Sequence, residues 1–303
     1  MAAPAQDDLA AYLEERRQPV EAALERAVSV LLSGVAEDVR RAAHHGVTSG
    51  GKRLRPILCV TSFEACGGQP APAVYDLAAS LELIHAYSLM HDDLPCMDDA
   101  ELRRGRATTH RAHGEDATMR AGAALIPAAA LQALDACRAI GCERERAVAV
   151  TRALLEAAGA GGMVGGQWID LMGEGRALGG AELDGLHRRK TGALLEASLV
   201  MGALAAGASP ILQGALREYG AAIGLAFQIA DDILDATQTA ETLGKNPSDA
   251  AFDKSTYVAL YGLDEARKRA QEQVERAIAA LGTAGLEAPM LRALARYVVE
   301  RDR

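Results

Sequence analysis

Apolar residues recur at the spacing of an α-helix along most of this chain. Between residues 7 and 43, the intervals between Leu13, Val20, Leu24 and Leu31 are seven, four and seven residues. A repeat near 3.6 residues places such side chains on one face of a helix. This region therefore predicts one or two opening helices.

Glycine and proline divide the rest of the chain into further helices. A loop over residues 46–56 precedes a helix that starts at Pro56, and a second helix runs from about Ala73 to Leu94, where Pro95 should end it. Further helical stretches are predicted at roughly 115–140, 145–172, 181–206, 212–238 and 254–280, with a last one from about 288. No linker rich in serine or proline and no short repeat interrupts them, so residues 1–303 are expected to form one domain.

The composition also favours helices. Aromatic residues make up 4% of the chain, alanine and leucine are abundant, and runs of β-branched residues are scarce. Half of the 303 residues are apolar, which is enough to bury the core of one large domain. We expect an all-α fold, an antiparallel bundle of about ten or more helices around a central cavity.

Charge and cysteine usage limit the possible functions and locations. The formal net charge is -9 without a Lys/Arg-rich run, so we expect no nucleic-acid partner. Five cysteines are an odd number without metal-ligand spacing, and the acidic N-terminus lacks the features of a signal peptide, which together indicate the cytoplasm. The longest apolar stretches, such as 193–212, contain Glu196, glycine or proline, so no membrane span is expected.

Four aspartates gather at the end of the second predicted helix, in the segment HDDLPCMDDAELRRGR. Asp92 and Asp93 precede Asp98 and Asp99 by six residues. Carboxylates are unfavourable at a helix C-terminus, where the macrodipole is negative, and they repel one another. The segment is either a solvated acidic turn or a site for a bound cation.

A second acidic cluster lies in the apolar sequence FQIADDILD. Asp231 and Asp235 are one turn apart, about 6 Å along the helix axis, and share a face. Charged groups in such an apolar stretch are seldom buried without a partner. Two aspartate clusters that face one cavity would supply the oxygen ligands with which magnesium is held at diphosphate sites.

With these motifs, the chain resembles the trans-prenyl diphosphate synthases, in particular the bacterial farnesyl diphosphate synthase group. The resemblance rests on GGKRLRP, ELIHAYSLMHDDLPCMDD, LRRG, GGQ, KTG, FQIADDILD, TLGK and KSTY, in this order along nearly the whole chain. It implies an isoprenoid synthase-like fold, a homodimer, and an enzyme that condenses isopentenyl diphosphate with dimethylallyl or geranyl diphosphate. In that reaction the allylic diphosphate ionises, the isopentenyl double bond attacks the carbocation, and a proton is lost.

The resemblance also implies the roles of individual residues. Three Mg²⁺ ions would clamp the allylic diphosphate between the two aspartate clusters, through Asp92, Asp93, Asp98, Asp231 and Asp235. The allylic diphosphate would also contact Arg103, Lys190, Gln228, Lys245 and Lys254, and the dipoles of Thr191 and Gln228 would face the cation. Isopentenyl diphosphate would bind without metal at Gly51, Lys52, Arg55, His85 and Arg104, where arginine forks suit phosphate oxygens.

Single residues among these also have plainer interpretations. Lys254 alone would be a solvated helix residue, and His85 alone would be a hydrogen-bonded core histidine. The glycines of GGMVGGQ follow a helix and not a strand, which excludes the dinucleotide-binding loop and favours close helix packing. Trp168 and the methionines are expected in the core or in the wall of the cavity.

Product length in the family follows the residues four and five positions before the first aspartate, here Ser88 and Tyr87. They lie roughly 6 and 7.5 Å down the helix from Asp92. Tyrosine followed by serine resembles the synthases of the fifteen-carbon farnesyl product, with geranylgeranyl or geranyl diphosphate as the alternatives.

Three positions depart from the family pattern. Ala123 replaces the aspartate of GDALL, the loop after Lys245 is shorter and poorer in glycine, and Val258 replaces a proline after KSTY. A catalytically silent partner subunit therefore remains an alternative to the enzyme. A terpene cyclase or head-to-head synthase is a second alternative, although these lack GGKRLRP together with the paired acidic motif and LRRG.

Overall fold

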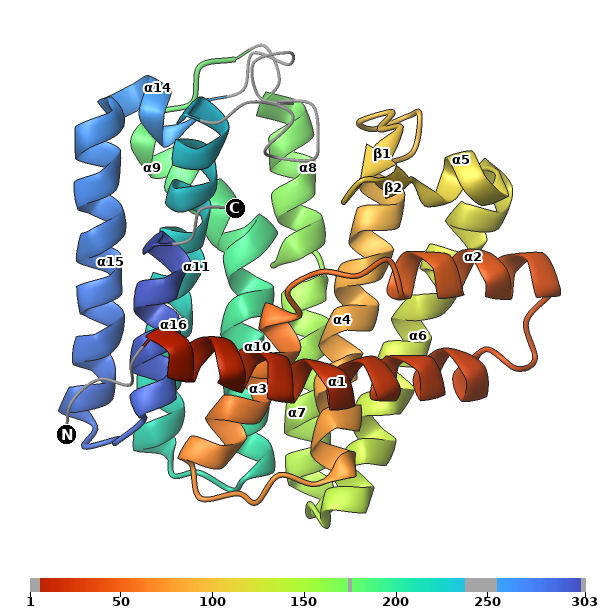
Figure 1. Ribbon diagram of the computed structural model, residues 1–303, viewed down its shortest axis with the longest axis horizontal. Helices are drawn as coiled ribbons and strands as arrows, with labels where there is room; N and C mark the ends of the chain where they lie inside the picture. Colours follow the sequence, from red (N-terminus) through yellow and green to blue (C-terminus); the bar gives the residue numbers. More distant parts are fainter. Residues whose placement is uncertain (1–5, 174–175, 238–254, 301–303) are drawn as a thin grey trace.

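Long antiparallel helices make up most of the protein in the computed structural model, which describes residues 6–173, 176–237 and 255–300 (Figure 1). The helices are α1 (Gln6–Leu31), α2 (Glu37–Val47), α3 (Leu54–Ala65), α4 (Pro72–Asp92), α5 (Thr109–His113), α6 (Glu115–Ile140), α7 (Arg144–Ala158), α8 (Met163–Gly173), α9 (Gly180–His187), α10 (Ala193–Ala205), α11 (Pro210–Thr237), α14 (Tyr257–Tyr261), α15 (Leu263–Thr283) and α16 (Pro289–Glu300). One π-helical turn, η1 (Arg188–Gly192), joins α9 to α10. The expected all-α bundle is confirmed.

Two large apolar clusters form the core, and α10 contributes to both. One cluster joins α10 to α4, α6 and α7, and the other joins it to α11, α15 and α16. The sequence of α10, ALLEASLVMGALA, is apolar on nearly every face, which is the pattern of a helix enclosed on all sides. It therefore forms the centre of the bundle.

The predicted helix ends agree with the structure where glycine or proline marks them. The helix predicted at 115–140 matches α6, and the predicted break before residue 212 lies beside Pro210. The expected helix at 145–172 is wrong in extent, because the backbone leaves the helix at Gly159 and α8 starts only at Met163. The helix expected at 254–280 is also divided, by Gly262 with a φ of 79°.

Close glycine contacts hold η1 against two neighbouring helices. A Cβ atom on Gly166 of α8 would lie 2.2 Å from the backbone nitrogen of Lys190, and one on Gly224 of α11 would lie 2.6 Å from the Cα atom of Gly192. The expected packing role of the GGMVGGQ glycines is thus confirmed at Gly166. The turn that carries Lys190 and Thr191 is fixed between α8 and α11 as a result.

The two helices that carry the aspartate motifs run in the same direction. Both α4 and α11 finish at the upper end of the bundle in Figure 1. A short hairpin, β1 (Leu102–Arg103) paired with β2 (Arg106–Ala107), and α5 lie at the same end. The sequence did not predict the hairpin, because two-residue strands carry no periodic pattern.

Candidate diphosphate site

The chain turns back on itself directly after α4. The backbone nitrogen of Asp98 donates to the carbonyl of Asp92 at 2.9 Å, and that of Asp99 donates to Leu94 at 3.1 Å. Asp99 has a φ of 44°, in the left-handed region that aspartate tolerates better than most residues. This turn brings Asp98 beside Asp92, two of the predicted metal ligands.

Asp92 lies in an environment that disfavours its charged form. Burial raises the pKa of its carboxyl to about 6, and the neighbouring carboxylates of Asp98 and Asp93 act in the same direction. The Lys190 ammonium is the strongest opposing influence. The motif at the end of α4 therefore faces the η1 turn, and a cation would relieve its crowding of negative charge.

Asp93, also predicted as a metal ligand, is engaged by a neighbouring cation. Its carboxylate is buried and accepts hydrogen bonds from Nε of Arg103 at 2.8 and 2.9 Å and from a terminal guanidinium nitrogen at 2.6 Å. This fork orients Arg103 beside Asp92 and Asp98. Asp93 thus differs from these two aspartates in being neutralised within the protein.

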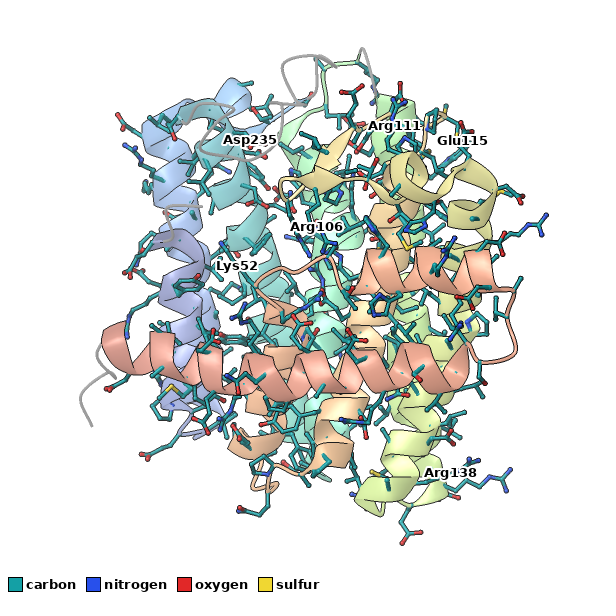
Figure 2. The ribbon with its side chains drawn as sticks, turned by 45° about the vertical axis from the view of Figure 1, so that its right-hand side comes forward. Lys52, Arg106, Arg111, Glu115, Arg138 and Asp235 are labelled. Carbon is teal, nitrogen blue, oxygen red and sulfur yellow. The ribbon has the colours of Figure 1, made fainter. Side chains whose placement is uncertain are left out.

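The three aspartates of α11 occupy different environments. Asp232 is buried and accepts a hydrogen bond from the backbone nitrogen of Tyr257 at 2.7 Å, so it joins α11 to α14. Asp231 and Asp235, the predicted ligands, are half-buried, and Asp231 is close enough to influence Arg55 electrostatically. Asp235 lies near the upper end of α11 (Figure 2).

Lys190 forms an ion pair that the sequence analysis missed. Its ammonium contacts the carboxylate of Asp170, on α8, at 2.5 Å. Asp170 is the single charged residue of the apolar sequence MVGGQWIDLMG, which is the signal that drew attention to Asp231. Thr191 follows Lys190 in the same π turn, and Gln228 lies one turn beyond Gly224 on α11.

The residues predicted for isopentenyl diphosphate gather below this aspartate region. Arg104 packs its guanidinium against Gly51, where a Cβ atom would lie 2.5 Å away, and donates to the carbonyl of Gly50. Lys52 lies in the loop before α3 (Figure 2), with its ammonium 6.0 Å from the centre of the Tyr297 ring.

Arg55 and His85, two half-buried members of this cation cluster, lie in surroundings that disfavour positive charge. Among the described residues, Nε of Arg55 is buried without a hydrogen-bond partner. Burial, followed by the charges of Arg55 and Arg104, lowers the pKa of His85 well below its usual value, so His85 is neutral at neutral pH. The cluster is thus complementary to an anion.

Tyr87 and Ser88, the predicted chain-length residues, lie on α4 below Asp92. Tyr87 is buried and meets the ring of His91 edge-on at 5.3 Å. Burial and the charge of Asp92 raise the pKa of Tyr87, so its ring stays neutral. Ser88 donates its hydroxyl to the carbonyl of His85 at 2.9 Å. Lys245 and Lys254, predicted for the allylic diphosphate, lie outside the described residues.

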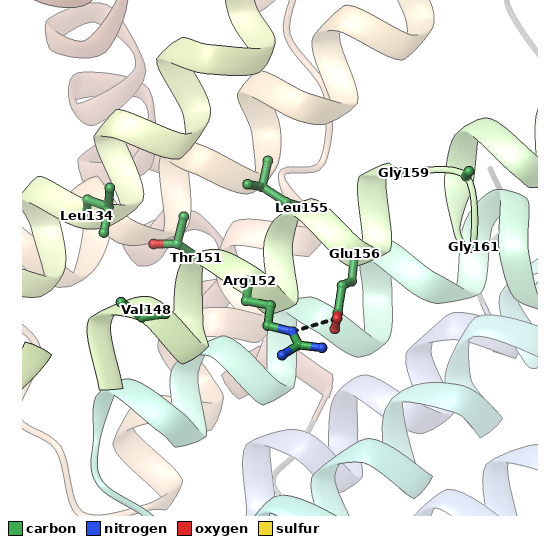
Figure 3. Close-up of a pocket in the computed structure, with 9 residues that line it drawn as sticks. Leu134, Val148, Thr151, Arg152, Leu155, Glu156, Gly159 and Gly161 are labelled. Atoms are coloured by element: carbon green, nitrogen blue, oxygen red, sulfur yellow. Dashed lines mark hydrogen bonds and ion pairs between the residues drawn. The ribbon is translucent and has the colours of Figure 1, made fainter. Parts of the chain in front are cut away.

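A broad hollow lies on the outer surface between α6 and α7 (Figure 3). It has a volume of about 850 Å³ and is lined by Leu134, Val148, Leu155 and the loop 159–161, among others. Exposed apolar residues continue from it along α8, as Val164, Trp168 and Met172 at intervals of four. Trp168 is 64% exposed, so its expected place in the core or the cavity wall is wrong.

Two segments in this region are long and apolar enough to cross a membrane by length and composition alone. They are Glu115–Ile140 and Arg144–Gly173, each with a mean hydropathy of 1.3 over its best window. About a third of the first window and under half of the second are buried, at 33% and 44%. The exposed apolar residues of these segments, together with Val164, Trp168 and Met172 of α8, form what we call the apolar surface of α6, α7 and α8.

Comparison with known proteins agrees with this arrangement. The family model of the polyprenyl synthetases matches residues 36–287. A dimethylallyltranstransferase of Fischerella ambigua is 42% identical over 96% of this chain and 83% of its own length. A farnesyl diphosphate synthase of Geobacillus stearothermophilus is 39% identical over 96% of this chain and 97% of its own. A chloroplastic geranylgeranyl pyrophosphate synthase of Catharanthus roseus is 40% identical, with 97% and 82% covered.

Solved structures share the same fold. An FPP/GFPP synthase from Zymomonas mobilis has a TM-score of 0.81 and 34% identity, with 96% of this chain and 99% of that one covered. A geranyltransferase from Helicobacter pylori, complexed with magnesium and isoprenyl diphosphate, has a TM-score of 0.79 and 30% identity, with 99% and 98% covered.

Proposed function

The chain belongs to the polyprenyl synthetase family of prenyltransferases, and on this premise we propose that it condenses isopentenyl diphosphate with dimethylallyl or geranyl diphosphate to give farnesyl diphosphate. The observation that carries the proposal is that two neighbouring polar regions differ in the charge of their side chains. One region combines the aspartates of α4 with Lys190, and the other gathers Arg55, His85 and Arg104 without a comparable acidic motif. A site that binds one diphosphate through magnesium and a second diphosphate without metal would need one acidic and one basic region of this kind.

We assign magnesium to Asp92, Asp98, Asp231 and Asp235, with three ions when substrate is bound. Their carboxylates are the hard oxygen donors that magnesium prefers, and the raised pKa of Asp92 marks a place where a cation is favourable. Asp93 fits less well, because Arg103 already neutralises it, and it would act by holding Arg103. Bound magnesium would neutralise the allylic diphosphate and make it a leaving group.

The residues around η1 would hold the allylic diphosphate and face the developing cation. Lys190 and Arg103 offer fixed positive charge, to which the predicted Lys245 and Lys254 would add. Thr191 and Gln228 offer side-chain dipoles that would stabilise positive charge on the allylic carbons. A π turn is a common way to place side chains at a functional site, and η1 is fixed by its glycine contacts.

The cation cluster of Gly51, Lys52, Arg55, His85 and Arg104 would bind isopentenyl diphosphate. Gly51 leaves room for the guanidinium of Arg104, and neutral His85 would serve as a hydrogen-bond partner and not as a charge. Once the allylic diphosphate has ionised, the isopentenyl double bond would attack the allylic carbon of the substrate beside it, and the condensed cation would then lose a proton.

Tyr87 supports a farnesyl product because a buried aromatic ring on α4 below Asp92 would stop a growing chain. The relatives include farnesyl and geranylgeranyl synthases, so geranylgeranyl diphosphate is the alternative product. The lengths of these products differ by one isoprene unit, which a single side chain can decide.

We also propose that the protein is a homodimer that pairs through the apolar surface of α6, α7 and α8. Seven exposed apolar residues lie there: Met119, Leu131, Val148, Leu155, Val164, Trp168 and Met172. Exposed apolar side chains that gather on neighbouring helices mark an interaction site. The ion pairs Arg152–Glu156 and Arg120–Asp116 on the same helices favour a protein partner over a lipid core. The cysteine and charge pattern supports a cytoplasmic location, although the Catharanthus relative is chloroplastic by name.

Product analysis tests the reaction. The purified protein is incubated with isopentenyl diphosphate, geranyl diphosphate and magnesium, with a chelator as the control. A magnesium-dependent farnesyl product is expected. A longer product would keep the reaction and refute Tyr87 as the floor of the cavity. Absence of product with every allylic starter would favour the silent partner subunit.

A further inference from the structure

Three charged side chains that no step of the proposed reaction uses lie beneath the loop that begins α3. Arg53 and Glu82 are each only 3% exposed. The guanidinium of Arg53 donates to Glu82 at 2.7 Å, to both oxygens of Glu21 at 2.8 and 3.1 Å, and to the carbonyl of Val47 at 2.9 Å. Arg53 thereby ties α1, α4 and the end of α2 to the loop.

The backbone at this point adopts conformations that need such support. Gly50 and Gly51 have φ values of 81° and 125°, and Arg53 has a φ of 51°. A residue other than glycine in the left-handed region costs about 1 kcal/mol or more, so the side-chain bonds of Arg53 must hold it there. Lys52, directly before Arg53, and Arg55, two residues after it, take their positions from this turn.

Glu82 is also the acidic residue that most favours the charged forms of Arg55 and Arg104. Burial lowers the pKa of Arg55 and of Arg104, and on both groups Glu82 is the first opposing influence. His85 lies one helical turn after Glu82 on α4, facing four arginines. Without Glu82, Arg53, Arg55 and Arg104 would repel one another across a buried space.

We propose that Arg53 and Glu82 are positioning residues for the metal-free diphosphate, which fix the Gly51–Arg55 loop and let its cations stand close together before isopentenyl diphosphate binds. The inference rests on the proposed function, and it concerns two residues that would not touch substrate. Support of this kind lowers the cost of ordering the ligands when the diphosphate arrives.

The first variant is Glu82→Gln, which keeps the size of the side chain and an oxygen that accepts from Arg53 but removes the charge. Steady-state kinetics give KM for isopentenyl diphosphate at saturating geranyl diphosphate, and the reverse. KM for isopentenyl diphosphate is expected to rise roughly tenfold or more, with KM for geranyl diphosphate changed less than about threefold, because only one of the two sites loses its support.

Glu64→Gln is the matched control. Glu64 is a part-buried carboxylate that, like Glu82, accepts a hydrogen bond from an arginine, here Arg16 at 2.7 Å, but it lies near the C-terminal end of α3, away from the Gly51–Arg55 loop. It should leave both KM values unchanged. Should Glu82→Gln fold poorly, Glu21→Gln replaces it, because the Glu21 side chain is 35% exposed and its loss leaves the Arg53–Glu82 bond intact. A smaller but equally selective rise is then expected.

The outcomes separate this inference from the proposed function. The positioning role would be overturned if the wild-type protein turns over but Glu82→Gln and Glu21→Gln change the two KM values equally, or change neither of them. A wild-type protein that neither turns over nor binds isopentenyl diphosphate in a calorimetric titration would overturn the proposed function itself. A selective rise that Glu64→Gln does not reproduce would establish the role.

Discussion

Neighbouring aspartates of one motif have separate tasks at the scale of the residue. Asp232 is buried and accepts a hydrogen bond from the backbone nitrogen of Tyr257, whereas Asp231 and Asp235 lie one turn apart on a different face of α11. The same division holds on α4, where Arg103 neutralises Asp93 beside Asp92. In each motif, therefore, one aspartate supports the structure, and the others are candidate metal ligands.

Asparagine substitutions distinguish the two tasks. Asp231→Asn should lower kcat by about a hundredfold or more while the unfolding temperature stays near that of the wild type, because only a metal ligand is lost. Asp232→Asn should instead lower the free energy of unfolding by about 1–3 kcal/mol, because a buried charged acceptor is lost. Magnesium-dependent turnover and thermal unfolding measure both. Near-normal turnover of Asp231→Asn would refute its assignment.

Tyr87 should set product length through its bulk. Tyr87→Ala is expected to shift the products toward twenty carbons, because removal of the ring opens space below Asp92. Tyr87→Phe is the control and should keep the farnesyl product, since the hydroxyl has no part in the steric effect. Chromatography of the dephosphorylated products gives the lengths. An unchanged profile in Tyr87→Ala would place the floor elsewhere.

The sequence revealed site residues that stand out from their local surroundings and missed those defined by partners far along the chain. Asp231 and Asp235 are visible because acids are rare in apolar helices. The pairing of Asp170 with Lys190, and of Arg53 with Glu82, joins residues 20 and 29 positions apart. Only the packing of α8 on η1 and of the loop on α4 brings these pairs together.

Glycine contacts decide the geometry at the scale of the element. Residues 159–162 are three glycines and one alanine, which can either break a helix or allow close packing of one, so the sequence alone did not show that α7 and α8 are separate helices. Likewise, no residue pattern distinguishes a π turn at Arg188–Gly192 from continuous α-helix. What can be recognised is the run of glycines that permits the close approach of α8 to η1.

Two glycines of α11 should respond in opposite ways to alanine. Gly224→Ala should cost about 1–3 kcal/mol of stability, because its Cβ would meet the backbone of Gly192. Gly214→Ala should stabilise the fold by about 0.4–1 kcal/mol, because it lies on the exposed face of the same helix with nothing within 4 Å. Denaturant unfolding of both variants measures the difference. Equal stability of the two variants would contradict the close packing of α11 against η1 at Gly224.

The apolar surface of α6, α7 and α8 dominates the exterior at the scale of the whole molecule. This surface is unsuited to a diphosphate: among the described residues that line its hollow, Arg152 is the one cationic side chain, and it pairs with Glu156. The fold class followed from composition and periodicity, but this surface did not. Exposure depends on which helix faces remain uncovered after packing.

Leu155→Glu should convert the proposed dimer into a monomer. A charge in the centre of an apolar interface would lose its hydration on association. Ile211→Glu is the control, because Ile211 is an exposed apolar residue at the start of α11, outside this surface. Light scattering after size-exclusion chromatography gives the masses. A wild-type monomer, or a dimer that survives Leu155→Glu, would count against the assignment.

The exposure of Trp168 on the proposed dimer surface means that its fluorescence can report on dimerisation. It is the single tryptophan of the chain, and it lies in the middle of the α8 stripe. Indole emission moves to shorter wavelength when water is removed from the ring. Dilution of the wild-type protein should therefore shift the fluorescence to the red as subunits part, and the midpoint of that shift would give the dissociation constant without any label.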